Sequence, residues 1–289
     1  MESVTPIRNL VVGANSILAR QLIDLLLSKD QLVIGVYHQH RSNLVEGIDY
    51  YGSDQLDEIK EVFDKVFIIS AFIPDRTHAK GTALSRSLFD VNVALINSIC
   101  EKFPEARIIY TSSVSVYGAD GGVKDERSDC NPATEYGISK LWGEKLVSDH
   151  DRYAIVRISS MYGIGMKETT FIPFAINSAL KKNAIDLLGD GSRAQNYIQV
   201  RDVAKCLYLA SETKENEVSL ATAMGSVTNL QLASIIRGIT GCSINFKGED
   251  ATPSSYYNNE RTRSFTGFLP DIELATGIKE LIEWKRKMF

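Results

Sequence analysis

A tyrosine and a lysine stand four residues apart in a segment typical of a helix. Tyr136 and Lys140 are the ends of the run Tyr-Gly-Ile-Ser-Lys, and this spacing places both side chains on one helix face. A free tyrosine has a pKa of about 10 and is a poor base at neutral pH, but a lysine cation one turn away favours the phenolate. The pair is therefore a candidate proton donor or acceptor for a substrate alcohol or ketone, although the pattern also arises by chance.

A serine run precedes this pair. The apolar segment Ala106–Ser112 is a candidate strand, and it is followed directly by Ser113. A serine hydroxyl at the end of a strand beside the helix can hydrogen-bond the same substrate oxygen that the tyrosine serves. The candidate catalytic residues are therefore Ser113, Tyr136 and Lys140.

A glycine turn near the start of the chain can hold the phosphates of a dinucleotide. Gly13, Ser16 and Ala19 are small residues with the spacing G-x-x-G-x-x-G, between a candidate strand and a candidate helix. Small residues there permit a tight turn and a close approach to a pyrophosphate, which the helix N-terminus attracts. An ordinary strand–helix turn can have the same pattern. The residues assigned to the cofactor phosphates are Gly13, Asn15, Ser16, Ile17 and Leu18.

The end of the second candidate strand bears on the choice of cofactor. An NAD site usually has an acidic residue there for the ribose 2′-hydroxyl, but this chain has Tyr37. Arg41, helped by His38 or His40, could instead meet a 2′-phosphate, although it could also be a solvated loop cation. The sequence therefore favours NADP(H) over NAD(H). The two histidines have no cysteine or carboxylate cluster beside them, so no metal site is predicted.

The first 160 residues alternate strand-like and helix-like segments. This alternation predicts βαβ units and a doubly wound parallel α/β sheet, a Rossmann-like lobe over residues 1–160 with a smaller lobe over 161–289. The two lobes are expected to interdigitate in one compact unit. The expected strands are Ile7–Val12, Leu32–Tyr37, Lys65–Ser70, Ala106–Ser112 and Tyr153–Ile158, and the expected helices are Ser16–Ser28, Gln55–Phe63, Leu84–Phe103 and Thr134–Ser148.

Composition excludes several classes of protein. The chain has 289 residues, of which 44% are hydrophobic and 24% charged, so it is globular rather than disordered. A net charge of −4 argues against a nucleic-acid surface. The longest apolar run is far short of the ~20 residues of a membrane span. Four scattered cysteines and the lack of a secretory signal favour a cytoplasmic protein.

The order of these motifs resembles that of the extended short-chain dehydrogenase/reductases that act as nucleotide-sugar epimerases, dehydratases and reductases. The resemblance runs nearly end to end. Besides the glycine turn and the Ser–Tyr–Lys set, the matching segments are Asp54, Ser70-Ala71, Asn92-Val93, residues 157–165, Gly189-Asp190-Gly191-Ser192, residues 197–204 and Gly267-Phe268-Leu269-Pro270.

The resemblance implies further site residues and an assembly. Asp54, Ser70, Ala71 and Met161 join Arg41, Tyr136 and Lys140 as cofactor-binding positions. The substrate, a nucleotide-diphosphate sugar, is expected to contact Ser113, Ser160, Arg193, Tyr197 and Arg261, with Arg263 as the alternative to Arg261. Family members are commonly homodimers through a bundle of the helices expected here over Leu84–Phe103 and Thr134–Ser148. A role in surface-polysaccharide synthesis would follow only at the level of the family.

Departures from the family pattern narrow the reaction. Val114 and Ser115 stand where dehydratases of the family carry an Asp-Glu pair. This chain therefore lacks the acid and the base that a dehydratase needs at these positions. The sequence predicts an NADP(H)-dependent reductase of a nucleotide-linked 4-keto-6-deoxy sugar. The alternatives are a nucleotide-sugar 4-epimerase with tightly bound NAD and, from another class, a catalytically silent NADP-sensing regulator.

Overall fold

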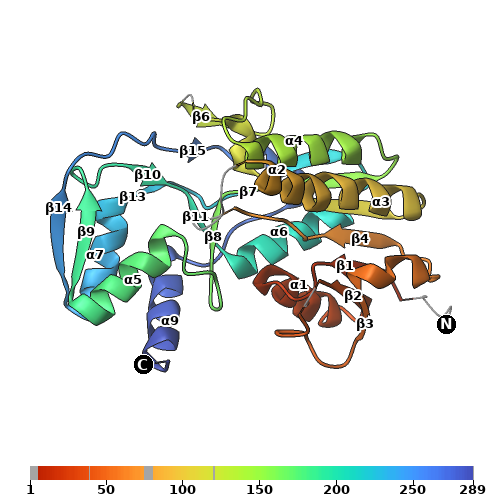
Figure 1. The fold of residues 1–289 in the computed structure, drawn as a ribbon, viewed down its shortest axis with the longest axis horizontal. Coiled ribbons are helices and arrows are strands. Elements are labelled where there is room, and N and C mark those ends of the chain that lie inside the picture. Colours follow the sequence, from red (N-terminus) through yellow and green to blue (C-terminus); the bar gives the residue numbers. More distant parts are fainter. Residues whose placement is uncertain (1–5, 39, 75–80, 120, 289) are drawn as a thin grey trace.

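A seven-stranded parallel sheet forms the centre of the protein, in the order β12-β7-β5-β4-β1-β2-β3 (Figure 1). The computed structural model describes residues 6–38, 40–74, 81–119 and 121–288. The expected doubly wound α/β class is confirmed. The strands are β1 (Arg8–Val12), β2 (Leu32–Tyr37), β3 (Asp49–Gly52), β4 (Lys65–Ile68), β5 (Arg107–Ser113), β7 (Tyr153–Ile158) and β12 (Glu217–Ala221).

Helices cover both faces of this sheet. Helices α1 (Ile17–Leu27) and α6 (Val200–Glu212) lie on one face, and α3 (Leu95–Lys102) and α4 (Glu135–Ser148) on the other (Figure 1). Because side chains alternate along a strand, each strand contributes to both cores. Val11, Phe67 and Ile109 pack with α1 and α6, whereas Leu10, Val66 and Ile108 pack with α3 and α4. Within the described ranges, no helix combines the length and apolar character that crossing a membrane requires.

A second lobe lies beside the sheet, at the left of Figure 1. Helices α5 (Phe171–Lys182), α7 (Asn229–Thr240) and α9 (Leu274–Arg286) pack with the parallel pair β9 (Ala184–Leu188) and β14 (Ser243–Lys247) around a separate apolar core. Short strand pairs lie between this lobe and the sheet: β8 (Ser160–Tyr162) with β11 (Tyr197–Gln199), β10 (Ala194–Gln195) with β13 (Val227–Thr228), and β6 (Val123–Lys124) with β15 (Tyr256–Tyr257). Helix α8 (Glu260–Thr266) packs against α6 and β12. Since α6 and β12 return to the central sheet, the two lobes interleave along the chain.

The helix expected over Gln55–Phe63 does not form over most of its length. The segment Gln55–Phe63 holds only the end of a 3-10 turn, η1 (Ser53–Glu58), and then runs without regular structure to β4. Its apolar spacing reflects burial rather than a helix, because Ile59 has an extended backbone and packs with Phe63 under the sheet. Strand β3 was not expected because two of the four residues in its sequence, Asp-Tyr-Tyr-Gly, are the strand-disfavouring types Asp and Gly.

The long helix expected over Leu84–Phe103 is present but is broken in register. It consists of α2 (Thr82–Phe89), a π-helical turn η2 (Asp90–Ala94) and α3. A single π turn inside a helix often marks a functional position. Here it carries Asn92, which is fully buried.

Candidate active site

The three candidate catalytic residues come from two neighbouring elements at the carboxyl ends of the central strands. Ser113 is the last residue of β5, while Tyr136 and Lys140 lie in the first turns of α4. The N-cap Thr134 fixes the start of this helix, because its hydroxyl accepts a hydrogen bond of 3.1 Å from the Gly137 N–H. Tyr136 is therefore held at the end of the sheet where ligands bind in open α/β folds.

Ser113 and Tyr136 interact directly. A hydrogen bond with Ser113 lowers the pKa of Tyr136, but burial has the larger effect and raises it to about 12. The Ser113 hydroxyl also accepts a bond of 3.1 Å from the Ser115 N–H and donates one of 3.1 Å to the Ser115 hydroxyl. The hydroxyls of β5 and α4 are thus already oriented toward one site.

Lys140 is buried without a hydrogen-bond partner. Its side chain is 1% exposed, and its ammonium nitrogen finds no acceptor among the described residues. The nitrogen lies 4.3 Å from the centre of the Tyr110 ring, a cation–π contact. Burial lowers the pKa of Lys140 to about 7, and the negative charge of Glu144 opposes this effect. Such a group is poised to donate to a ligand that enters beside it.

A buried ion pair lies next to this lysine. Arg157 at the end of β7 forms a two-pronged pair with Glu144, with distances of 2.9 and 2.7 Å. Glu144 also accepts a bond of 2.5 Å from Ser112, and Arg157 donates one of 2.9 Å to Tyr117. The pair ties α4 to β5 and β7 directly beneath the catalytic residues. This pair was not expected from the sequence, although Glu144 stands one turn after Lys140.

The glycine turn has the shape expected of a phosphate-binding loop. Gly13 adopts a φ of +91°, and a β-carbon there would lie 2.6 Å from the Ser70 backbone nitrogen. The backbone of β1 therefore passes close to the end of β4, where Ser70 and Ala71 follow. Ser16 is the N-cap of α1 and accepts a bond of 3.1 Å from the Ala19 N–H.

Other residues of the turn are committed to structural contacts. The Asn15 amide donates to the carbonyl oxygens of His38 and His40, at 3.4 and 3.2 Å. Leu18 is 4% exposed in the core, and Ile17 packs against the same core. Their side chains are thus turned toward the protein, so Leu18 could serve a ligand only through its backbone.

The residues expected to contact the ribose of the cofactor lie at the end of β2. Arg41 is exposed, and its guanidinium lies 5.3 Å from the centre of the Tyr37 ring. His38 hydrogen-bonds the Ser53 hydroxyl at 2.7 Å, and Asp54 follows on the same turn with its side chain exposed. These positions gather at the carboxyl ends of β2 and β3.

Asn92 connects the cofactor loop to the catalytic helix. Its side-chain oxygen accepts a bond of 2.8 Å from the Phe72 N–H, and its nitrogen donates to the Phe72 carbonyl at 3.0 Å and to Ser139 at 3.0 Å. Sequence reasoning noted Asn92 only through the family resemblance, because no local pattern shows a contact that spans 47 residues.

A pocket of about 350 Å³ opens beside the catalytic residues. Ser115 and Thr134 line it from the first lobe, while Arg193 and the segment 252–257 line it from the second. The Arg193 Nε is buried and has no hydrogen-bond partner among the described residues. Ser113 and Tyr136 do not line the pocket themselves, but Ser115 and Thr134, two residues away along the chain, place it next to them.

The remaining substrate positions lie where the two lobes join. Ser160 is exposed on β8 and is paired with Tyr197 of β11, and Met161 packs against the core under α1 and α6. The Tyr197 hydroxyl accepts a bond of 2.9 Å from Gln195. Ser160 and Met161 thus lie at the junction at which the chain leaves the central sheet.

Arg261 is not brought to the pocket. Its guanidinium pairs with Glu217 at the start of β12, which is the amino end of the strand. Arg263, two residues further along α8, contacts the sulfur of Met224 at 3.7 Å, and its Nε is buried without a partner among the described residues. Neither arginine lines the pocket, but Arg263, unlike Arg261, has no carboxylate partner in the described part of the chain.

Comparisons with known proteins agree with this geometry. The model of the NAD dependent epimerase/dehydratase family matches residues 9–222. A putative UDP-glucose 4-epimerase of Methanocaldococcus jannaschii is 26% identical, over 96% of this chain and 98% of its own length.

Solved structures share the fold at low identity. UDP-glucuronic acid 4-epimerase from Bacillus cereus, in complex with NAD, has a TM-score of 0.85 at 20% identity and covers 98% of this chain and 99% of its own. MoeE5 in complex with UDP-glucose and NAD has a TM-score of 0.83 at 23% identity, over 97% and 99% of the two chains. Both neighbours hold NAD, so the expected preference for NADP(H) gains no support from them.

Proposed function

Since the chain belongs to the NAD-dependent epimerase/dehydratase family, we propose that it is a nucleotide-sugar 4-epimerase that works with NAD. The observation that carries the proposal is the Ser113–Tyr136–Lys140 set, with a hydroxyl pair in contact and a buried lysine whose ammonium group has no hydrogen-bond partner among the described residues. The full-length similarity to a putative UDP-glucose 4-epimerase supports this choice over the 4-ketoreductase that the sequence alone predicted.

The residues present fit a dinucleotide. Lys140 offers a buried, unpartnered ammonium group for the ribose hydroxyls, and the close approach at Gly13 leaves no side chain between the turn and a pyrophosphate. When bound, NAD supplies a hydride acceptor that can return the hydride. The N–H groups at the start of α1 would hold the phosphates, with Ser70 and Ala71 on the facing loop.

Tyr136 moves the proton. Ser113 orients the sugar hydroxyl, and Tyr136 as phenolate takes its proton and later gives it back to the same oxygen, so that no net proton is consumed. In the free protein the pKa of Tyr136 is about 12, because burial dominates. A positive charge beside the ring lowers this pKa, so Lys140 in its protonated form prepares Tyr136 for the reaction.

The pocket between the lobes would hold the nucleotide diphosphate. Arg193 presents an unpartnered, buried Nε to it, and a guanidinium fork suits a diphosphate. We propose a UDP-sugar as substrate, in line with the similarity to the putative UDP-glucose 4-epimerase of Methanocaldococcus jannaschii. Arg263 is the proposed second contact in place of Arg261.

Two other reactions of the family fit less well. Val114 packs against a small apolar cluster with Val116 and Tyr117, so neither it nor Ser115 provides the acid and base of a dehydratase. A 4-ketoreductase would use the same Ser–Tyr–Lys set but would consume a reduced cofactor in each turnover. The exposed Arg41 could meet a 2′-phosphate, and titrating the protein with NAD and NADP separately measures that preference.

A tyrosine variant tests the proposal. Purified protein should interconvert UDP-glucose and UDP-galactose, and Tyr136→Phe should lower turnover by about 10²–10⁴ while NAD affinity changes little. Tyr208→Phe, on α6 and away from the pocket, is the control and should keep full turnover. Full activity in Tyr136→Phe would refute the assignment of this residue.

A further inference from the structure

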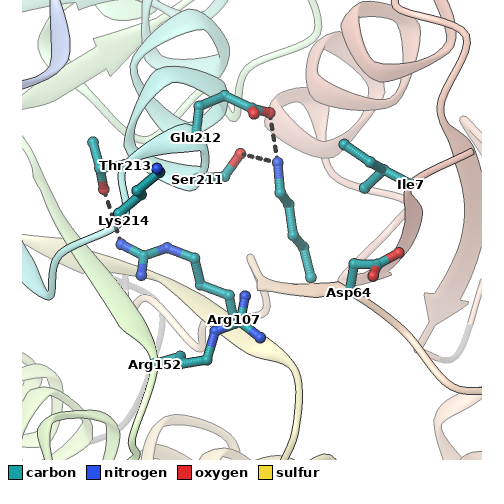
Figure 2. Close-up of a pocket in the computed structure, with 9 residues that line it drawn as sticks. Ile7, Asp64, Arg107, Arg152, Ser211, Glu212, Thr213 and Lys214 are labelled. Carbon is teal, nitrogen blue, oxygen red and sulfur yellow. Dashed lines mark hydrogen bonds and ion pairs between the residues drawn. The ribbon is translucent and has the colours of Figure 1, made fainter. Parts of the chain in front are cut away.

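A second cavity lies at the opposite end of the central sheet. It has a volume of about 350 Å³ and is lined by the amino ends of the strands and the end of α6 (Figure 2). Arg107 begins β5 here, whereas Ser113 ends the same strand. A strand rises about 3.3 Å per residue, so about 20 Å separate this cavity from the catalytic serine.

The lining is rich in positive charge. Four cations (Lys65, Arg107, Arg152 and Lys214) face two carboxylates (Asp64 and Glu212), which leaves an excess of two positive charges. The whole chain, in contrast, has a net charge of −4. The carboxyl end of helix α6 contributes roughly half a negative charge, which is too little to balance the excess.

The cations are not equally neutralised. Lys65 pairs with Glu212 at 2.5 Å and also donates to Ser211. Arg107 has no carboxylate partner among the described residues, and its Nη2 donates to two neutral oxygens, the Thr213 hydroxyl at 2.9 Å and the Glu215 carbonyl at 2.7 Å. Glu212 is thus occupied, and Arg107 lacks a counter-charge.

The buried Arg107 side chain is the most important feature of this cavity. Its side chain is 3% exposed, and its Nε is buried with no acceptor in the described part of the chain. In Figure 2, Arg107 and Arg152 lie together on one side of the cavity, and Glu212 lies on the other. Burial and the neighbouring Arg152 both lower the pKa of Arg107. An unpaired buried cation is costly, and an anion in the cavity would remove that cost.

We propose that this cavity is a binding site for a small phosphate-bearing anion, separate from the catalytic pocket. Arg107, Arg152 and Lys214 form no ion pair with a carboxylate among the described residues, and the lining, with Asp64 included, keeps an excess of two positive charges, which suits a ligand with at least two negative charges. The lining has no aromatic side chain and a single aliphatic one, Ile7, so it offers no surface on which a nucleobase could stack. The ligand is therefore pyrophosphate or a small phosphorylated metabolite rather than a nucleotide.

Binding of inorganic pyrophosphate tests this site without relying on activity. Because the catalytic pocket is expected to take a diphosphate too, the measurement uses an Arg193→Gln background and isothermal titration calorimetry. We expect binding in this background, and we expect Arg152→Glu to weaken it at least tenfold. Arg237→Glu makes the same charge change on the exposed face of α7 and should leave the affinity unchanged.

One further variant, a second anion and a salt control separate the possible explanations of the binding result. Lys214→Glu, on an exposed loop, should weaken binding in the same direction as Arg152→Glu, so a folding defect in one variant does not decide the result. Equal affinities in Arg152→Glu and Arg237→Glu would overturn the proposal, as would complete loss of binding in Arg193→Gln alone. Citrate binding as tightly as pyrophosphate would overturn the assignment to phosphate, and a sodium chloride control at equal ionic strength should produce no heat of binding.

Discussion

Lys140 and Lys145 lie on the same helix in opposite environments. Lys140 is 1% exposed, whereas the Lys145 side chain keeps 71% of its surface exposed and pairs with Asp149 at 2.6 Å. Burial of a cation without a partner costs free energy, and protein structures keep such groups mainly where a ligand or a reaction needs them. The pKa of Lys140, about 7, is the chemical consequence of this position.

The burial of Lys140 makes stability depend on pH. The folded protein holds this lysine with a pKa of about 7, while the unfolded chain has the ordinary value near 10.5, so the unfolded state binds more protons between these limits. Its destabilising effect is therefore complete below about pH 7 and fades as the pH rises toward 10.5. Lys140→Met should be more stable than the wild type at pH 7, on the order of a few kcal/mol, and this gain should shrink by pH 10.

Thermal denaturation of the cofactor-free protein across this pH range measures the difference. Lys145→Met is the matched control, because it removes an exposed lysine from the same helix. Its difference from the wild type should stay constant with pH. A constant difference for Lys140→Met as well would contradict a lowered pKa of Lys140 in the folded protein.

The Glu144–Arg157 pair should dominate the electrostatic stability of this region. Both side chains are 7% exposed, and Glu144→Gln leaves the Arg157 charge without its partner. Removing one member of a buried pair typically costs 3–5 kcal/mol, whereas an exposed pair contributes about 0–1 kcal/mol. Urea denaturation of Glu144→Gln and of Asp149→Asn, which breaks the exposed pair on the same helix, should differ by this margin. Similar midpoints for the two variants would refute the role of the pair.

Spacing along the chain predicted some residues of the site and not others. Tyr136 and Lys140 are visible because helix periodicity links positions four apart. The contacts of Asn92 with Phe72 and Ser139 cross 20 and 47 residues, and no local pattern reports them. The contact of Arg261 with Glu217, which spans 44 residues, was likewise not visible in the sequence.

Helix α4 lies unusually close to the turn η3 (Val114–Tyr117) that follows β5. A β-carbon at Gly137 would lie 2.5 Å from the Ser115 carbonyl oxygen and 2.9 Å from the Pro132 β-carbon. Neither atom can yield without moving the backbone. This glycine therefore sets the distance between the helix that carries Tyr136 and the strand that carries Ser113.

Gly137→Ala should separate these two elements. We expect a loss of stability of about 1–3 kcal/mol from overpacking, together with lower turnover, because the helix must move away from Ser113. Gly238→Ala in α7 is the control, since nothing lies within 4 Å of its β-carbon, and it should stabilise the protein by about 0.5–1 kcal/mol. Chemical denaturation and activity measured on both variants check this. A stabilised, fully active Gly137→Ala would show that the close approach is not required.

The elements were predicted best where burial is continuous. Strands β2 and β7 have the bounds expected from their apolar runs, because strands covered on both faces have few polar interruptions. Strand β12 was not expected, since it returns from the second lobe and is separated from β7, the preceding strand of the central sheet, by 58 residues. The order of strands in the sheet and the joining of the lobes depend on such distant pairings.

On the scale of the whole molecule, an apolar face is left exposed over α2 and α4. Phe89 and Trp142 are 44% and 51% exposed and form an edge-to-face ring contact at 5.7 Å, and Ile138 beside them is 53% exposed. Other apolar residues of the helices expected to form the bundle face the core instead, since Leu88 and Ile99 are buried.

A homodimer through this face stays a prediction, and Phe89, Ile138 and Trp142 are now the residues expected in its interface. Trp142→Glu should convert a dimer to a monomer in analytical ultracentrifugation, because a buried charge in the interface is costly. Val62→Glu changes an exposed apolar residue elsewhere and should leave the assembly unchanged. A monomeric wild type, or a Trp142→Glu variant that remains dimeric, would contradict this assignment.

The proposed epimerase activity requires that the hydride taken from the sugar is returned to it within the same turnover. The most direct measurement is to purify the protein without added cofactor, identify any bound nucleotide by mass spectrometry, and then follow NADH absorbance while UDP-glucose is converted. We predict that NAD accompanies the protein and that UDP-galactose forms with no net change in NADH. Protein that arrives without cofactor, and that oxidises NADPH only when a nucleotide-linked 4-keto sugar is present, would contradict the epimerase and establish the reductase.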